Sequence, residues 1–173
     1  ANGRTADGIY QDFVRQVTEL PKFNAKSKCM IALAFITPRV DSPMESKTRI
    51  ATTKYGLPPA VTNYTVPGAT FSNGAPITLD LAWPEFRVAI EYDGDHHRTD
   101  KNQWRRDNDK RELLRHHHWI VIIATAANMA DETSQAELAY RVGRQLALRG
   151  AVFDFTLTAT PLDELARRRR RRI

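Results

Sequence analysis

Three carboxylates on two neighbouring segments are the residues of this sequence best suited to do chemistry. Residues 77–83 alternate apolar and polar side chains, and Asp80 lies on the polar side. Residues 86–93 alternate in the same way, with Glu91 and Asp93 on the polar side. Two such segments joined by a short turn predict a β-hairpin. The three acids should therefore lie on one face of that hairpin.

With a turn at residues 84–85, Asp80 faces Ala89 and is the diagonal neighbour of Glu91. Side chains in that relation lie about 5–8 Å apart. Carboxylates this close repel one another, so that one takes up a proton or a cation binds between them. Hard oxygen ligands favour Mg²⁺ or Mn²⁺. The alternative is that these acids form only the polar outer face of an antiparallel hairpin.

The elements that position these acids follow from hydrophobic periodicity and cap residues. A helix precedes the hairpin, a second follows it, and the continuous apolar segment 119–124 predicts a buried strand. The predicted fold class is α/β (α+β), with an α-β-β-β-α-β core, a mixed sheet flanked by helices and a parallel crossover. The expected helices are residues 24–36, 43–55, 100–117 and 132–148, and the expected strands are residues 61–66, 77–83, 86–93 and 119–124.

Cap signals are clearest for the helix at residues 43–55. Ser42 is a favourable N-cap, Pro43 suits the first helical position and Glu45 completes a capping box. Gly56 stands where a C-terminal cap belongs. This helix should therefore begin and end sharply.

The remaining signals divide the chain into three parts. We expect an N-terminal arm or linker at residues 1–23, a main domain at residues 24–156 and a basic tail at residues 157–173. Asn24 is the expected N-cap of the first helix in the main domain. Pro and Gly residues predict a loop over residues 67–76. Apolar residues at 152, 153 and 155 should add an edge strand or a packing arm.

Composition limits the class of protein. The chain has 173 residues, of which 42% are hydrophobic and 27% are charged, and this mixture excludes wholesale disorder. The single cysteine, Cys29, excludes an intramolecular disulfide and favours a reducing compartment, which we expect to be the cytoplasm. No apolar segment approaches the roughly 20 residues that a membrane span needs. We therefore predict no membrane partner.

Positive charge is concentrated at the C-terminus. The chain has 26 Lys and Arg against 20 Asp and Glu, but six of the arginines are consecutive at residues 167–172, and without them the counts are 20 and 20. Such a run is either a solvated tail or an arm that binds phosphates. The second alternative makes candidate nucleic-acid contacts of Arg167, Arg168, Arg169 and Arg170.

A second basic group follows the hairpin. Arg98, Arg105, Arg106, Lys110 and Arg111 lie at or within the helix expected at residues 100–117. They could contact phosphates beside the acids. The alternative is a solvated helix face stabilised by pairs one turn apart.

Two motifs in the hairpin resemble a known family. Residues 79–84 (LDLAWP) and 91–97 (EYDGDHH) are similar to those of the uncharacterised endonuclease-like family related to very-short-patch-repair endonucleases, in the PD-(D/E)XK restriction-endonuclease-like superfamily. Residues 42–46 and 104–107 support the resemblance, which covers roughly residues 25–150. It implies a restriction-endonuclease-like α-β-β-β-α-β core, Mg²⁺ or Mn²⁺ as cofactor, and DNA as partner.

The resemblance also implies roles for individual residues. Asp80 and Glu91 would be acidic metal ligands, the backbone carbonyl of Tyr92 a further ligand, and Glu45 a helix carboxylate that reaches the metal directly or through water. Asp93 stands where the superfamily has a lysine, so the cation that usually orients the attacking water is missing. His97 could act as the acid or base in its place, since histidine titrates in the useful range. The alternative is that His97 only ends the strand or contacts phosphate.

The function implied is a metal-dependent endonuclease that hydrolyses DNA phosphodiester bonds, in DNA repair or phage defence. The alternative is a catalytically silent nuclease-fold module that binds nucleic acid as an antitoxin-like or regulatory protein. The missing lysine favours that alternative, and the carboxylates favour the enzyme. Relatives of the family often carry a winged-helix antitoxin-like segment before this domain, which suggests a longer parent protein here. Many nucleases of the superfamily are dimers, so a homodimer stays open.

Overall fold

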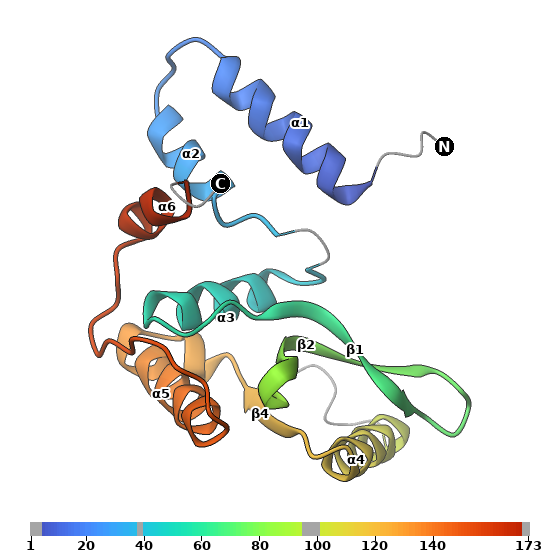
Figure 1. Cartoon of the computed structure of the whole chain (residues 1–173). Coiled ribbons are helices and arrows are strands. Elements are labelled where there is room, and N and C mark those ends of the chain that lie inside the picture. The colour runs from blue at the N-terminus through green and yellow to red at the C-terminus, as the bar shows by residue number, and fades with distance from the viewer. Residues whose placement is uncertain (1–4, 38–39, 95–100, 171–173) are drawn as a thin grey trace. The chain divides into compact units, whose positions relative to one another are not determined.

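The computed structural model describes residues 5–37, 40–94 and 101–170. The described chain divides into two compact units (Figure 1). One unit combines the residues up to 37 with those from Thr160 onward, and the other spans Val40–Ala159. This division differs from the one expected at residues 23/24 and 156/157. Within the described residues, no helix combines the length and apolar character needed to cross a membrane.

The first unit is helical. It consists of α1 (Ala6–Glu19), α2 (Lys26–Leu33) and α6 (Leu162–Arg170). Thr5 caps α1 by accepting a hydrogen bond from the Gly8 N–H at 3.1 Å, so the expected arm forms a helix of 14 residues. The prediction that Asn24 caps α2 was wrong, because Ala25 holds the N-cap position in a left-handed conformation. Apolar residues recur in α1 at helical spacing, so the expectation of an arm or linker missed a helix that the sequence indicates.

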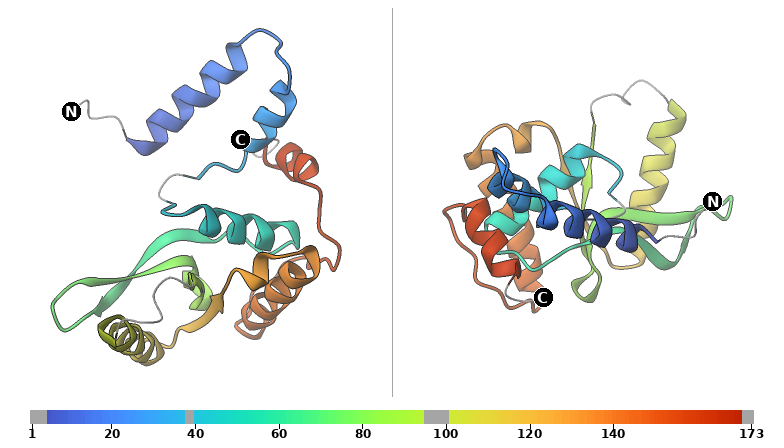
Figure 2. Two further views of the ribbon diagram at one scale, coloured as in Figure 1. Left: turned by 180° about the vertical axis from the view of Figure 1, so that it is seen from behind. Right: turned by 90° about the horizontal axis from the view of Figure 1, so that it is seen from above.

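The second unit contains the predicted mixed sheet. The strand order is β1-β2-β3-β4, with β1/β2 and β2/β3 antiparallel and β3/β4 parallel. Helices α3 and α5 pack on one face and α4 on the other (Figures 1 and 2). The α-β-β-β-α-β order is confirmed. The elements are α3 (Pro43–Lys54), β1 (Val61–Thr70), β2 (Pro76–Trp83), β3 (Val88–Tyr92), α4 (Lys101–His116), β4 (Ile120–Ala124) and α5 (Glu132–Leu148), with short 3₁₀ turns at Pro84–Phe86 and Ala127–Met129.

The start of α3 forms as its cap residues predict. The Ser42 hydroxyl accepts a hydrogen bond from the Glu45 N–H at 3.1 Å. The Glu45 carboxylate accepts from the Asp41 N–H at 3.1 Å, so the return bond of the cap goes one residue before Ser42. Gly56 ends the helix with φ +85°, a conformation that glycine adopts without steric cost.

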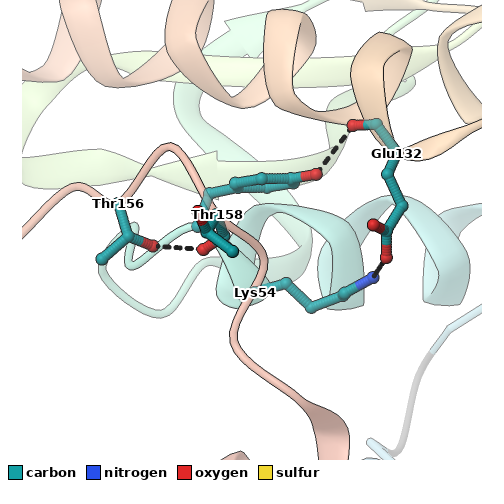
Figure 3. Close-up of polar contacts among 5 residues, drawn as sticks. Lys54, Glu132, Thr156 and Thr158 are labelled. Atoms are coloured by element: carbon teal, nitrogen blue, oxygen red, sulfur yellow. Dashed lines mark hydrogen bonds and ion pairs between the residues drawn. The ribbon is translucent and has the colours of Figure 1, made fainter.

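Helices α3 and α5 meet in a junction, defined by residues 54–56 of α3 and its cap, residues 131–132 of α5 and the strap at residues 151–159. The Tyr55 hydroxyl donates to the Glu132 carbonyl oxygen at 2.7 Å, and Lys54 pairs with the Glu132 carboxylate at 3.2 Å (Figure 3). The strap is ordered by its own hydrogen bond from the Thr156 hydroxyl to the Thr158 carbonyl oxygen at 2.9 Å.

The strap passes close to the end of α3. The Thr156 N–H donates to the Tyr55 carbonyl oxygen at 3.1 Å, and a Cβ added at Gly56 would collide with the Asp154 carbonyl oxygen. Phe153 and Phe155 pack against the core between the sheet and helices α3 and α5. The segment therefore forms the packing arm, not the edge strand.

Strand β1 is longer than expected. It continues through Pro67 and Gly68, which were expected to begin a loop, and its register with β2 shifts between Thr65 and Thr70. An irregularity of this kind accommodates proline and glycine within a strand pair.

A second irregularity lies at Asn63. This residue has φ +46°, and it lies between the pairs Thr62↔Leu81 and Tyr64↔Leu79, opposite Asp80. The prediction that one face of β2 would remain on a single core was wrong. Before Asp80, the buried side chains of β2 pack in the core with α4; after it, Leu81 and Trp83 pack in the core with α3 and α5.

The β2–β3 hairpin has a longer turn than predicted. Its pairs are Leu81↔Ile90, Ala82↔Ala89 and Trp83↔Val88. The turn spans residues 84–87, with Arg87 left-handed at φ +49°. The prediction that Asp80 faces Ala89 was therefore wrong by two residues. Because side chains alternate with a period of two, a shift of two residues still leaves Asp80 and Glu91 on the same side of the sheet, where both line one hollow.

Candidate functional site

A hollow of about 190 Å³ opens beside the end of β3. Its volume equals that of about six water molecules, and it is smaller than the pockets that hold organic ligands. It suits an ion that keeps part of its hydration shell, as Mg²⁺ does. The described residues that line it come from β2, β3, α4 and β4, and they are Asp80, Glu91, Tyr92, Asp93, Gly94, Asp107, Lys110, Arg111 and Ile123.

Asp80 and Glu91 are the central carboxylates of this hollow. Extending the β2–β3 register by one residue places them directly opposite each other, closer than the diagonal relation expected from sequence. The Tyr92 N–H donates to Asp80 Oδ2 at 2.8 Å. One carboxylate is therefore fixed by backbone of the neighbouring strand, beside the other.

Both carboxyl groups have raised pKa values. Burial is the main cause for Asp80, and the charge of Asp41 raises its pKa further, while the Tyr92 hydrogen bond and Lys110 lower it. Burial is also the main cause for Glu91, with Asp80 and Asp107 adding to it and Lys110 opposing. Loss of hydration disfavours the charged form of each acid. A cation bound between the two carboxylates would stabilise their charged forms, which lose stabilisation by water on burial.

Lys110 already supplies one such cation. Its Nζ pairs with Glu91 Oε1, and the two side chains are only 21% and 16% exposed. The lysine belongs to α4, one helical turn after Asp107. Among the described lining residues, four carboxylates face two cations. By formal charge, these described residues therefore stay net negative with Lys110 in place.

Asp93 joins the other two acids, as predicted. Its N–H donates to the Ala124 carbonyl oxygen at 2.8 Å, which continues the pairing of β3 with β4, and its side chain lines the hollow. The predicted residues His97 and Arg98 lie outside the described residues, and so does the side chain of Arg105.

Glu45 is buried but does not line the hollow. It accepts a hydrogen bond from Asp41, whose own charge raises the pKa of Asp80. The start of α3 thus lies within electrostatic range of the hollow. The role of Glu45 as a metal ligand remains a prediction.

The basic residues expected to contact nucleic acid separate into different environments. Arg111 is exposed and lines the hollow. Arg106 lies over the Phe71 ring, with its guanidinium carbon 5.2 Å from the ring centroid. In α6, Arg167 and Arg168 pair with Asp163 and Glu164 one turn earlier, at 2.9 and 2.7 Å. The side chains of Arg169 and Arg170 are outside the described residues.

The donors present fit a hard divalent cation by their chemistry. Asp80, Glu91 and the Tyr92 backbone carbonyl offer the oxygen ligands that Mg²⁺ and Mn²⁺ prefer. In the described part of the chain, no three His, Cys, Asp or Glu side chains converge closely enough to hold a metal ion. The described chain therefore contributes a pair of adjacent carboxylates, and water or substrate oxygens would complete the coordination shell.

Two acids of this region were not predicted from the sequence. Asp107 lines the hollow and raises the pKa of Glu91, and Asp41 raises that of Asp80. The spacing of Asp107 and Lys110 by three residues places both on one side of α4, and this signal was available. For Asp41 the sequence offered none, because its proximity to β2 depends on tertiary packing.

Comparisons with known proteins find sequence similarity to two uncharacterized proteins, and this similarity indicates no function. Uncharacterized protein MT2308 of Mycobacterium tuberculosis (strain CDC 1551 / Oshkosh) and uncharacterized protein Rv2248 of Mycobacterium tuberculosis (strain ATCC 25618 / H37Rv) are each 28% identical over 114 residues. The alignment covers 66% of this chain and 40% of each relative, so the aligned part spans well under half the length of these proteins. No family model and no solved structure matches the chain.

Proposed function

We propose that this chain is a metal-dependent nuclease domain that hydrolyses DNA phosphodiester bonds. The observation that carries the proposal is the pair Asp80 and Glu91, which lie on adjacent antiparallel strands, are desolvated, and line a hollow of ionic size. The resemblance of residues 79–84 and 91–97 to the very-short-patch-repair-related endonuclease family supports the same activity. A role in repair or phage defence follows from that resemblance alone.

In the proposed reaction, Asp80 and Glu91 would hold a Mg²⁺ or Mn²⁺ ion together with the Tyr92 carbonyl. Such an ion, when bound, lowers the pKa of a bound water and neutralises charge on the scissile phosphate. The Tyr92 N–H keeps Asp80 oriented toward the neighbouring strand. Arg111 at the edge of the hollow would attract the phosphate, and His97 would act as the acid or base.

A second function is favoured by the pairing of Lys110 with Glu91. An internal cation that neutralises Glu91 would also suit a domain that binds nucleic acid without a metal and without cutting it. This is the catalytically silent, antitoxin-like or regulatory module. The missing lysine at Asp93 favours it as well.

Cleavage of supercoiled plasmid and of labelled single-stranded DNA, with Mg²⁺, Mn²⁺ or EDTA, tests the proposal. We expect metal-dependent cutting that falls at least about 100-fold in Asp80→Ala and in Glu91→Ala, since even groups that only orient a ligand are worth 10–100-fold. Glu132→Ala, which removes a carboxylate of the α3–α5 junction, is the matched control and should cut normally.

Each other outcome has a definite meaning. Cutting that survives in both Asp80→Ala and Glu91→Ala would contradict the proposed site. No cutting by the wild type, together with DNA binding that weakens with salt, would establish the silent module. Neither cutting nor binding would overturn both functions.

A further inference from the structure

The ion pair between Lys110 and Glu91 differs from an ordinary surface pair. Both side chains are largely covered, and Glu91 faces Asp80 across the strand pair. A covered carboxylate without a partner is costly, so the lysine compensates a charge that burial would otherwise disfavour. Lys110 contacts Glu91 Oε1, an oxygen that a divalent cation held by Glu91 would also contact.

The two cations cannot share that oxygen without strong repulsion. An ammonium group and a divalent cation about 4 Å apart repel strongly at the effective dielectric constant of a protein surface. Lysine carries its charge on a flexible four-carbon stem, so the ammonium can move while the α4 backbone stays in place. Exchange of one cation for the other is therefore sterically simple.

We propose that Lys110 is the internal counter-ion of Glu91, a positioning residue that leaves this carboxylate when a divalent cation binds and then faces the phosphate entering the hollow. The inference rests on the proposed function. It assigns to α4 the positive charge that Asp93 cannot provide from β3. It also explains how Glu91 can be largely covered, since Lys110 neutralises its carboxylate.

The test measures Mn²⁺ affinity by titration calorimetry on the full chain, with cleavage as a second readout. Lys110→Met removes the competing charge and keeps most of the side-chain volume, and we expect Mn²⁺ to bind about tenfold more tightly, which corresponds to about 1.4 kcal/mol. Cleavage should nevertheless fall about 100-fold, the loss typical of removing one group that stabilises the transition state.

Arg111→Met is the matched control, because Arg111 is the next residue, lines the same hollow and carries the same charge. Its effect on Mn²⁺ affinity reports the loss of a positive charge beside the hollow and should stay below about threefold. Lys110→Arg keeps the charge and guards against misfolding, and its Mn²⁺ affinity should be no tighter than that of the wild type.

Unchanged or weaker Mn²⁺ binding by Lys110→Met would overturn the inference, and so would a gain equal to that of Arg111→Met. Cleavage by Lys110→Met at the wild-type rate would overturn the part of the inference in which Lys110 faces the phosphate. If the wild type does not cut DNA at all, the proposed function fails, and the Mn²⁺ comparison still decides whether Lys110 is the counter-ion.

Discussion

Two Lys–Glu pairs in the same unit show how position changes the role of one kind of contact. In the α3–α5 junction, Lys54, itself 17% exposed, meets a Glu132 side chain that is 75% exposed, and the neighbouring Tyr55 hydroxyl donates to the Glu132 carbonyl oxygen (Figure 3). In the hollow, Lys110 meets a Glu91 that is 16% exposed and faces further carboxylates. Water can replace the first pair at little cost. Water has little access to the Lys110–Glu91 pair, so Glu91 needs a cation as its partner, and a divalent cation could take the place of Lys110.

The largest expected effect on the free energy of unfolding comes from a change at the junction. This follows if the junction contributes to stability and the hollow does not. Gly56→Ala places a Cβ against the Asp154 carbonyl and forces alanine into a left-handed conformation. We expect a loss of about 2–5 kcal/mol in the free energy of unfolding, measured in urea. Gly150→Ala is the matched control, since Gly150 has φ +90° with no atom within 4 Å of an added Cβ, and it should lose only about 1–2 kcal/mol.

Equal losses in the two glycine variants would show that the strap does not press on α3 as described. A loss of metal binding by folded Gly56→Ala would show that the junction and the hollow are not separate in function.

A pH dependence of stability distinguishes the hollow. Because Asp80 and Glu91 have raised pKa values in the folded chain, their contribution to stability is fully present below their ordinary values and is lost as the pH rises through the folded values. In EDTA, the free energy of unfolding should therefore increase as the pH is lowered from about 8 to about 5. The Asp80→Asn/Glu91→Gln double variant should show a flatter profile, and an unchanged profile would mean that these acids are not desolvated.

The smallest effect is expected at the pair of Lys54 and Glu132, whose carboxylate side chain is exposed. Lys54→Gln removes its contact with Glu132 and a positive charge in the last turn of α3, which together are worth less than about 1 kcal/mol. Thermal unfolding at low and high salt measures this loss, which should shrink in high salt. A loss of several kcal/mol would erase the contrast between the two pairs.

The sequence predicted the sheet and the faces of β3 well, but not the change of face within β2. Alternation in residues 77–83 and 86–93 placed Asp80, Glu91 and Asp93 on one face, and the structure brings all three to one hollow. The helix predicted at residues 132–148 from its regular apolar spacing forms at those bounds, and the structure adds Asp131 as its N-cap. These features depend on local patterns, which sequence reports directly.

Features that depend on tertiary contacts could not be predicted in the same way. The 3₁₀ turn after Trp83 makes the hairpin turn longer than predicted. Arg87 adopts a left-handed conformation there, which could not be predicted because arginine rarely adopts it. Lys110 reaches Glu91 only once α4 packs across the sheet. The sequence showed Lys110 as one of several basic residues on a helix and gave no reason to separate it from Arg111.

The four-residue hairpin turn has a consequence for how this domain can vary. Insertion or deletion of one residue at residues 84–87 would rotate β3 by half a period, so that Glu91 would point into the apolar core under α3 and α5 and Ile90 into the hollow. A change of two residues would leave both faces as they are. Length variation at this surface turn, where Glu85 and Arg87 are exposed, is therefore restricted to even steps in any homologue that keeps both acids in place.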